Sequence, residues 1–277
     1  MTNTVAKARG GSGSKAWIIG VAALVVVLIA LVVAVVSTKS STKKTPTGTA
    51  ATSVVHQVTN VPASVAASVG VGTGQATPTV PTGLTALTKD GKPELLYVGA
   101  EYCPYCATER WAMVEALSRF GTFSNLKLTH SSSSDVFPDT PTFTFHGATY
   151  TSPHLTFTPV ELSTNQPDGN GGYTPLDTLT TEQQDIVTRF SQQGSIPFMD
   201  IGGKFILSGV TYDPKVLQGK TAEEIAAAMQ DPTTDIAKGA IGSANSLTAM
   251  ICKTTGNQPA KVCSTPTITA IQKTLPS

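Results

Sequence analysis

The longest hydrophobic stretch of the chain lies near its beginning, between polar flanks. Residues 17–36 contain no charge and are almost all Val, Leu, Ile and Ala. About twenty helical residues rise about 30 Å, the thickness of a bilayer's hydrocarbon core. Trp17 suits the interfacial end of such a helix. The pattern predicts a transmembrane anchor over residues 17–37, preceded by a tail over residues 1–16 that we expect in the cytoplasm.

A cleavable signal peptide is the alternative for this stretch. Signal peptides have a shorter apolar region, followed by a cleavage site with small residues at alternate positions. Here the stretch ends Val35-Val36-Ser37, and Ala34 is the only small partner nearby. These features favour an uncleaved anchor. Lys and Arg residues lie on both sides of the span in similar numbers, so the positive-inside rule does not set its orientation.

The following segment, residues 38–83, shows neither a sustained helical period nor a sustained strand period. It consists mostly of Thr, Ser, Ala, Val, Gly and Pro, and it lacks aromatic residues. This composition predicts a flexible tether with a root-mean-square reach of about 35 Å. Within this segment, residues 53–61 are a candidate for a stray edge strand.

The remainder, residues 84–277, alternates apolar runs with amphipathic segments, which predicts one α/β domain. Residues 94–98 are an apolar run bounded by Pro93 and Gly99, typical of a buried strand. Residues 104–120 have helical spacing. We expect Ala107, Trp111, Val114 and Leu117 on the inner face of this helix, with Arg110, Glu115 and Arg119 directed elsewhere.

The remaining elements are also predicted from apolar spacing. Helix caps and a Gly202-Gly203 hairpin turn mark where some of them begin or end. The predicted elements are a strand at 126–130, β-structure at 142–150 and 155–162, a loop at 165–173, a helix at 181–192, strands at 196–201 and 204–207, a helix that opens with a capping box at 221–224, and a last helix at 233–253.

The charge composition argues against one class of partner. Charged residues make up 13% of the chain and the formal net charge is +1. This composition provides neither a basic face for nucleic acid nor an acidic tail. We therefore expect no nucleic-acid partner.

The strongest chemical signal is Cys103-Pro104-Tyr105-Cys106, which lies between the predicted buried strand and the predicted helix. A helix start has unpaired N–H groups and the positive end of the helix dipole, and both stabilise a thiolate at Cys103. The thiolate is the attacking species in disulfide exchange. Pro104 fits the first helical turn. We expect Cys103 to be an exposed nucleophile and Cys106 a more buried resolving thiol. We also expect no cofactor, because the Cys103–Cys106 disulfide itself carries the electrons.

A zinc site or a purely structural bridge would also use paired cysteines. Zinc needs two more ligands, but the other cysteines lie far downstream and the candidate histidines, His130, His146 and His154, are scattered along the chain. Isolated histidines of this kind are usually hydrogen-bonded residues without a metal. We therefore predict redox chemistry and no metal site.

A second element is Ile196-Pro197. A proline that begins a strand ahead of a hairpin is a place where a cis X–Pro bond turns the chain. Together with the strand, the Cys-x-x-Cys motif and the helix, this element resembles the thioredoxin superfamily over roughly residues 93–230. The resemblance implies a mixed central sheet with flanking helices, a cis Pro197 beside the dithiol, and backbone hydrogen bonds from Ile196 to the substrate. Tyr102, directly before the motif, and Tyr105, within it, are expected as further substrate contacts.

Residues 97–106, 119–123 and 251–259 resemble, more closely, an uncharacterised prokaryotic membrane-anchored family, domain of unknown function family 929. That resemblance names a relative and no activity. The sequence departs from thioredoxin itself, because Tyr97 stands where thioredoxin has a buried carboxylate. Glu101 is a weak substitute as a base, since it should be exposed. The dipeptide Pro104-Tyr105 is typical of glutaredoxins, although no glutathione-binding pattern is found.

Cys252 and Cys263 lie around an irregular loop. A bridge between them would add roughly 3 kcal/mol by the loop-entropy model and would hold the chain end to the last helix. We expect this structural disulfide, with a second redox pair that relays electrons as the alternative.

The sequence therefore predicts a membrane-anchored thiol–disulfide oxidoreductase that acts on client proteins, with a membrane redox partner to reset it. A redox dithiol needs an oxidising or membrane-coupled setting, so we expect the domain outside the cytoplasm and the N-terminus inside. Two rivals use the same residues: a copper or zinc metallochaperone, and a tethered binding domain without catalysis. The direction of electron flow, the client proteins and the oligomeric state are not determined by the sequence.

Overall fold

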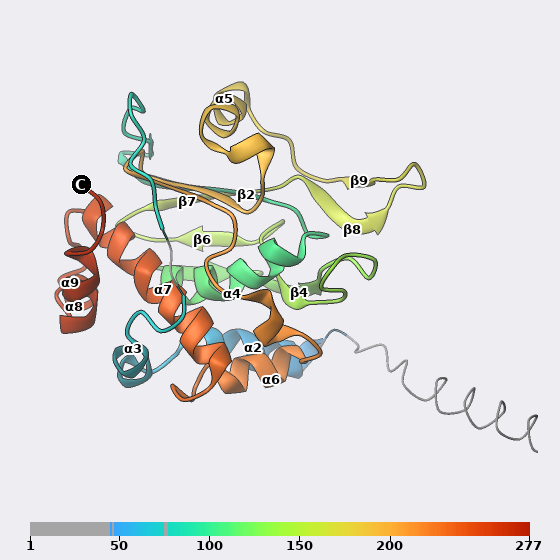
Figure 1. The fold of residues 1–277 in the computed structure, drawn as a ribbon, viewed down its shortest axis with the longest axis horizontal. Coiled ribbons are helices and arrows are strands. Elements are labelled where there is room, and N and C mark those ends of the chain that lie inside the picture. The colour runs from blue at the N-terminus through green and yellow to red at the C-terminus, as the bar shows by residue number, and fades with distance from the viewer. Residues whose placement is uncertain (1–44, 46, 75–76) are drawn as a thin grey trace, which may run out of the picture. The chain divides into compact units, whose positions relative to one another are not determined.

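Strand β2, Lys92–Gly99, is the centre of the fold in the computed structural model, which describes residues 45, 47–74 and 77–277 (Figure 1). It pairs in parallel with β7, Thr156–Glu161, and antiparallel with β10, Phe198–Ile201. Strand β11, Phe205–Ser208, continues the sheet beyond β10. The short β1, Thr88–Lys89, pairs with the start of β2. The sheet is thus mixed, as expected for an α/β fold.

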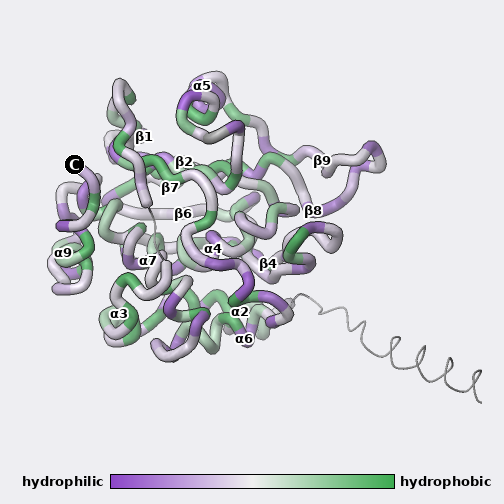
Figure 2. The backbone as a smooth tube through the Cα atoms, viewed as in Figure 1, coloured by the Kyte–Doolittle hydropathy of each residue, from purple (hydrophilic) through white to green (hydrophobic). Residues whose placement is uncertain are grey.

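Helices cover both faces of this sheet (Figure 1). Leu95 and Tyr97 belong to the larger hydrophobic core, which they share with helices α4, Pro104–Ser118, and α7, Asp235–Thr254. Leu96 and Val98 belong to a second core beneath α5, Thr181–Phe190. A strand buried on both faces reads as a continuous apolar run, which explains the pattern at residues 94–98. Figure 2 shows hydrophobic residues along the central strands and polar ones at the tip of the hairpin that follows β8.

Helix α4 is enclosed on every side, so the one-sided face predicted for it is wrong in part. All of its residues from Cys106 to Leu117 are buried. Arg110 and Glu115, which we expected to point away from the core, are 0% and 4% exposed. Helix α7 packs along α4, and β5 closes another side of it through the hydrogen bond from the Thr142 hydroxyl to the Ala107 carbonyl, 2.7 Å.

The region between β2 and β10 contains three small two-stranded sheets. The predicted strand at 126–130 is present but lies outside the central sheet, and the predicted loop at 165–173 is largely a hairpin. The pairs are β3, Thr122–Ser124, with β6, Thr149–Thr151; β4, Lys127–His130, with β5, Pro141–Thr144; and β8, Ser163–Pro167, with β9, Tyr173–Pro175.

The C-terminal part is helical. The capping box predicted at 221–224 is confirmed, since the Thr221 and Glu224 side chains each accept a hydrogen bond from the other residue's backbone N–H. It opens α6, Ala222–Ala228. After α7 the chain ends in two short helices, α8, Ala260–Cys263, and α9, Pro266–Gln272.

The tether expected over residues 38–83 is wrong for much of its described part, including the stray strand at 53–61. Helix α2, Gly48–Thr59, and helix α3, Ala63–Val69, lie there instead. Val54 and Val58 are fully buried, one helical turn apart. Thr, Ser and Val have modest helix propensity, so these helices depend on tertiary burial rather than on local preference. The folded unit therefore begins at Thr45 rather than at residue 84.

The predicted anchor at residues 17–37 lies outside the described residues. Within the described part of the chain, no helix is both long and apolar enough to cross a membrane.

A buried carboxylate joins α4 to α7. Oε2 of Glu109 accepts hydrogen bonds from the backbone N–H and the hydroxyl of Thr211, at 2.9 and 2.7 Å. The Ser243 hydroxyl lies 3.4 Å from Oε1. Burial raises the pKa of Glu109 to about 7, although these hydrogen bonds lower it. Near neutral pH the native state therefore holds a proton that the unfolded chain releases.

Replacement of the Glu109 carboxylate should change how the free energy of unfolding depends on pH. A raised folded-state pKa means that stabilisation is complete below about pH 4.5 and is lost as pH rises to about 7. In Glu109→Gln, an amide replaces the protonated acid and this loss should disappear, with a gain of up to about 3 kcal/mol above pH 7. Urea unfolding across this pH range measures the effect. Glu223→Gln, at an exposed carboxylate, is the control. An unchanged pH slope in Glu109→Gln would contradict the assignment.

Candidate active site

The dithiol lies where the chain leaves the central strand and begins α4. Cys103 is the N-cap residue of the helix, and Pro104 occupies its first turn. The Cys103 N–H donates to the Ala100 carbonyl at 3.2 Å, which turns the chain after β2. The Cys106 backbone N–H donates to Cys103 Sγ, also at 3.2 Å. A sulfur thus satisfies a helix N–H that usually needs an oxygen cap.

The two sulfurs differ in acidity. The hydrogen bond with the Cys106 side chain lowers the pKa of the Cys103 thiol, and the Cys106 N–H and the Arg110 charge act in the same direction against burial. Burial raises the pKa of Cys106 well above its ordinary value. The arrangement therefore favours a thiolate at Cys103 and a thiol at Cys106. Cys103 is less open than we expected, because only 4% of it is exposed, against 0% for Cys106.

Ile196 and Pro197 lie against this pair. The peptide bond between them is cis. The Cys103 thiol points to the Ile196 carbonyl oxygen at 3.9 Å, and Ile196 packs in one cluster with both cysteines. The structure thus brings together the two elements that lie more than ninety residues apart in the sequence.

Aromatic side chains surround the dithiol. Tyr102 stacks on Tyr173 of β9, with ring centroids 4.2 Å apart and planes 5° apart. Tyr105, 39% exposed, meets Phe137 edge-on at 6.0 Å. Val136 beside Phe137 is 60% exposed. Sequence reasoning named Tyr102 and Tyr105 but missed their partners Tyr173 and Phe137, which lie 71 and 32 positions away with no sequence signal that joins them.

The charged pair behind the dithiol was also missed. Arg110 donates to Glu161 at the end of β7, with Nε to Oε1 at 2.9 Å and Nη2 to Oε2 at 2.6 Å. Nη2 also donates to the Ala100 carbonyl at 2.8 Å. Both charged side chains are 0% exposed. The sequence did contain a signal for the position of Arg110, since this residue follows Cys106 by one helical turn and lies on the same face of the helix.

Tyr97 of β2 faces this cation. The Arg110 guanidinium carbon lies 5.9 Å from the Tyr97 ring centroid. Among the described residues, Tyr97 Oη and Arg110 Nη1 are buried without a hydrogen-bond partner. Glu101 is half-buried rather than exposed. The dithiol therefore has a buried cation behind it, and the Arg110 charge lowers the pKa of both thiols.

Two of the three candidate histidines pair with carboxylates. His130 lies 3.6 Å from Asp139, and His146 lies 2.8 Å from Asp177. His154 is half-buried between β6 and β7. Across residues 45, 47–74 and 77–277, no group of three or more His, Cys, Asp or Glu residues could hold a metal ion.

Cys252 and Cys263 form a disulfide with their Cα atoms 5.5 Å apart. Cys252 lies near the end of α7 and Cys263 at the end of α8. The bond thus joins the last long helix to the chain end. Both residues are buried, at 0% and 2% exposure.

Comparison with known proteins gives one match. A family model described as "Domain of unknown function (DUF929)" matches residues 82–253, which is more than half of the chain. No curated protein and no solved structure matches the chain.

The acidity difference predicts selective alkylation of the reduced protein. Between pH 6 and pH 9, iodoacetamide should modify Cys103 and leave Cys106 largely unmodified, because the pKa of Cys103 is lowered and that of Cys106 is raised. Peptide mass spectrometry measures each site, and the urea-unfolded protein, in which both thiols should react alike, is the control. Exchange of the whole ion pair in Arg110→Met with Glu161→Leu should shift the Cys103 profile to higher pH. Equal rates at the two cysteines in the folded protein would contradict the site.

Proposed function

Because the chain belongs to the family described as a domain of unknown function (DUF929), which names no activity, we propose its function from the site itself. The protein is a thiol–disulfide oxidoreductase that acts on protein disulfides through Cys103 and Cys106. The observation that carries this proposal is the Cys103 sulfur at the start of α4. It accepts the Cys106 N–H at 3.2 Å and lies 3.9 Å from the Ile196 carbonyl oxygen.

The reaction follows from this arrangement. The Cys103 thiolate attacks one sulfur of a client disulfide, the client S–S bond breaks, and the other client sulfur leaves as a thiolate. Cys106 then loses its proton and attacks Cys103 Sγ, which releases the second client sulfur as a thiol. The client gains two electrons and the protein ends with a Cys103–Cys106 disulfide. In the reverse direction the same mixed disulfide transfers a disulfide to a client dithiol.

The surroundings of the dithiol support a protein or peptide substrate. Tyr102 with Tyr173, and Tyr105 with Phe137, offer aromatic surface on either side of Cys103. The Ile196 carbonyl and the adjoining chain before β10 supply backbone groups that an extended client would use. Aromatic side chains of this kind provide large contact areas in interfaces.

The thioredoxin-like character of the fold belongs to this proposal. Its support is the order of elements: β2, the dithiol, α4, then Pro197 followed by the antiparallel pair β10–β11. The disulfide of Cys252 and Cys263 acts in this proposal as a structural bond, because it is buried and crosses a short loop.

The proposed setting is the outer side of a cell membrane. Residues 17–37 have the length and hydropathy of a single-pass anchor, and a dithiol that exchanges with protein disulfides works in an oxidising compartment. The N-terminal tail would then lie inside the cell, and a membrane redox partner would reset the dithiol.

Removal of the resolving thiol should trap the intermediate. Cys106→Ser should accumulate disulfide-linked adducts with client proteins, because nothing resolves the Cys103 mixed disulfide. Cys103→Ser, the matched control, should trap few or none. Non-reducing gel electrophoresis followed by mass spectrometry of the adducts measures both. Equal trapping by the two variants would reverse or remove the assigned roles, and stoichiometric copper or zinc in a reduced protein without exchange activity would favour a metallochaperone.

The proposed topology can be tested in intact cells. After mild reduction, a small membrane-impermeant thiosulfonate should label Cys103 in the full chain. Ser14→Cys in a Cys103→Ser, Cys106→Ser background, which places the thiol in the N-terminal tail, should label only after the cells are permeabilised. Failure of Cys103 to label in intact cells, with labelling after permeabilisation, would place the domain inside.

A further inference from the structure

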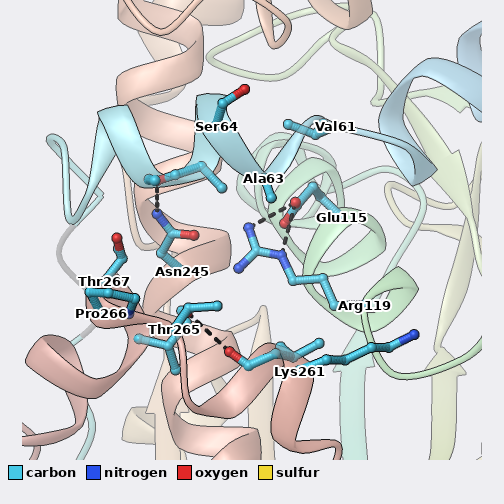
Figure 3. A pocket seen from close by; sticks show the side chains of 14 residues that line it. Val61, Ala63, Ser64, Glu115, Arg119, Asn245, Lys261, Thr265, Pro266 and Thr267 are labelled. Atoms are coloured by element: carbon cyan, nitrogen blue, oxygen red, sulfur yellow. Dashed lines mark hydrogen bonds and ion pairs between the residues drawn. The ribbon is translucent and has the colours of Figure 1, made fainter.

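A cavity of about 500 Å³ lies between α3 and the two C-terminal helices, with the C-terminal part of α4 beside it (Figure 3). This volume is in the range of about 300–1,000 Å³ that is usual for small-molecule sites. Nothing in the proposed disulfide chemistry uses the cavity. It lies at the opposite end of α4 from Cys103, beside Glu115 and Arg119.

Most of the cavity wall is apolar. Helix α3 and Val61, two residues before it, contribute small or branched side chains, and α8 and α9 supply the facing side. Polar groups enter from α4 and α7. The main apolar lining residues are Val61, Ala63, Ala66, Val262 and Ile268.

Two buried oxygen atoms in this wall have no hydrogen-bond partner among the described residues. They are Oε2 of Glu115 and Oδ1 of Asn245, and both residues are at least nine-tenths buried. Figure 3 shows their side chains directed into the space between α3 and the C-terminal helices. The orientation of the Asn245 amide is set by its nitrogen, which donates to the carbonyls of Ala66 and Gly70 at 2.8 and 2.6 Å. Oδ1 is therefore a fixed acceptor.

The charges around these acceptors restrict the ligand further. Arg119 donates to Glu115 Oε1 from Nε and Nη2, at 3.0 and 2.8 Å, and to the Thr248 hydroxyl from Nη1 at 3.0 Å. The cation is thus already engaged and leaves no strong site for an anion. A cationic ligand would meet the Arg119 guanidinium. The exposed Lys261 side chain extends away from the space beside Asn245, so its ammonium group supplies no anion site there (Figure 3). An uncharged ligand with a hydrogen to donate fits best.

We propose that this cavity binds a neutral, mainly apolar molecule that carries a hydroxyl group. The hydroxyl donates to Glu115 Oε2 or Asn245 Oδ1, and the apolar body packs on α3, α8 and α9. Buried polar atoms are almost always hydrogen-bonded in folded proteins, so a donor in this position supplies what the two oxygens lack.

Three matched probes test the class of ligand on the full chain. 2-Naphthol has an apolar body and one donor, 2-methoxynaphthalene has the same body without a donor, and 2-naphthoate has an anion in its place. Fluorescence titration at pH 7 should show 2-naphthol binding about tenfold more tightly than 2-methoxynaphthalene, the effect of one buried hydrogen bond. 2-Naphthoate should bind most weakly. Equal affinity of the first two, tighter binding of the anion, or no 2-naphthol binding up to its solubility limit would overturn the proposal.

Variants place the binding in this cavity. Ala67→Trp adds bulk from an exposed lining position on α3 and should weaken 2-naphthol binding at least tenfold. Ser68→Trp, the exposed neighbour outside the cavity wall, should leave binding unchanged. Glu115→Gln removes the charge that engages Arg119, so 2-naphthoate should gain affinity relative to 2-naphthol. Unchanged 2-naphthol binding in Ala67→Trp, with thermal unfolding of both Trp variants close to that of the parent, would show that the probe binds elsewhere and overturn the assignment.

Discussion

The buried ion pair of Arg110 and Glu161 is the interaction on which the arrangement around the dithiol depends. Arg110 comes from α4 and Glu161 from the end of β7, and both side chains are fully buried. Their hydrogen bonds extend to the Ala100 carbonyl after β2 and to the Phe145 N–H after β5. One charged pair thus joins the helix that carries the cysteines to three strands. A buried pair of this kind is costly to break, because either partner alone would be an uncompensated charge in the core.

The same pair contributes to the electrostatics of the sulfurs, after burial and the hydrogen bonds between the two cysteines. Helix starts stabilise thiolates through their N–H groups, and here the Cys106 N–H meets Cys103 Sγ directly. Arg110, one turn beyond Cys106, adds a positive charge on the inner side. With Tyr97 uncharged beside it, the site has a buried cation and no carboxylate free of a salt bridge at that position. This arrangement favours Cys103 as a thiolate.

Helix α4 also links the dithiol to the rest of the molecule through polar contacts on its other sides. Glu109 joins it to α7 and Thr211, Trp111 donates to the Pro141 carbonyl of β5 at 2.8 Å, and the C-cap residue Arg119 donates to the Thr248 hydroxyl of α7 at 3.0 Å. A helix enclosed on all sides needs such partners, because polar side chains that are buried without them would cost stability. The small sheets between β2 and β10 serve two purposes. They cover α4, and they place Tyr173 and Phe137 beside the cysteines.

The sequence by itself determined the local elements: β2, α4 with Cys103 at its start, the β10–β11 hairpin and the Thr221 capping box. Each depends on a short-range pattern of apolar spacing, caps or turn residues. Tertiary structure alone decided the rest. The residues of α2 and α3 were predicted to form a tether, because many of them have modest helix propensity. They become helical through the burial of residues such as Val54. Arg110 was predicted to point away from the core. The helical period of residues 104–120 cannot show that a second helix and a sheet cover the other faces of α4. Its partner Glu161 lies 51 residues away, and only the parallel pairing of β7 with β2 brings the two charges together.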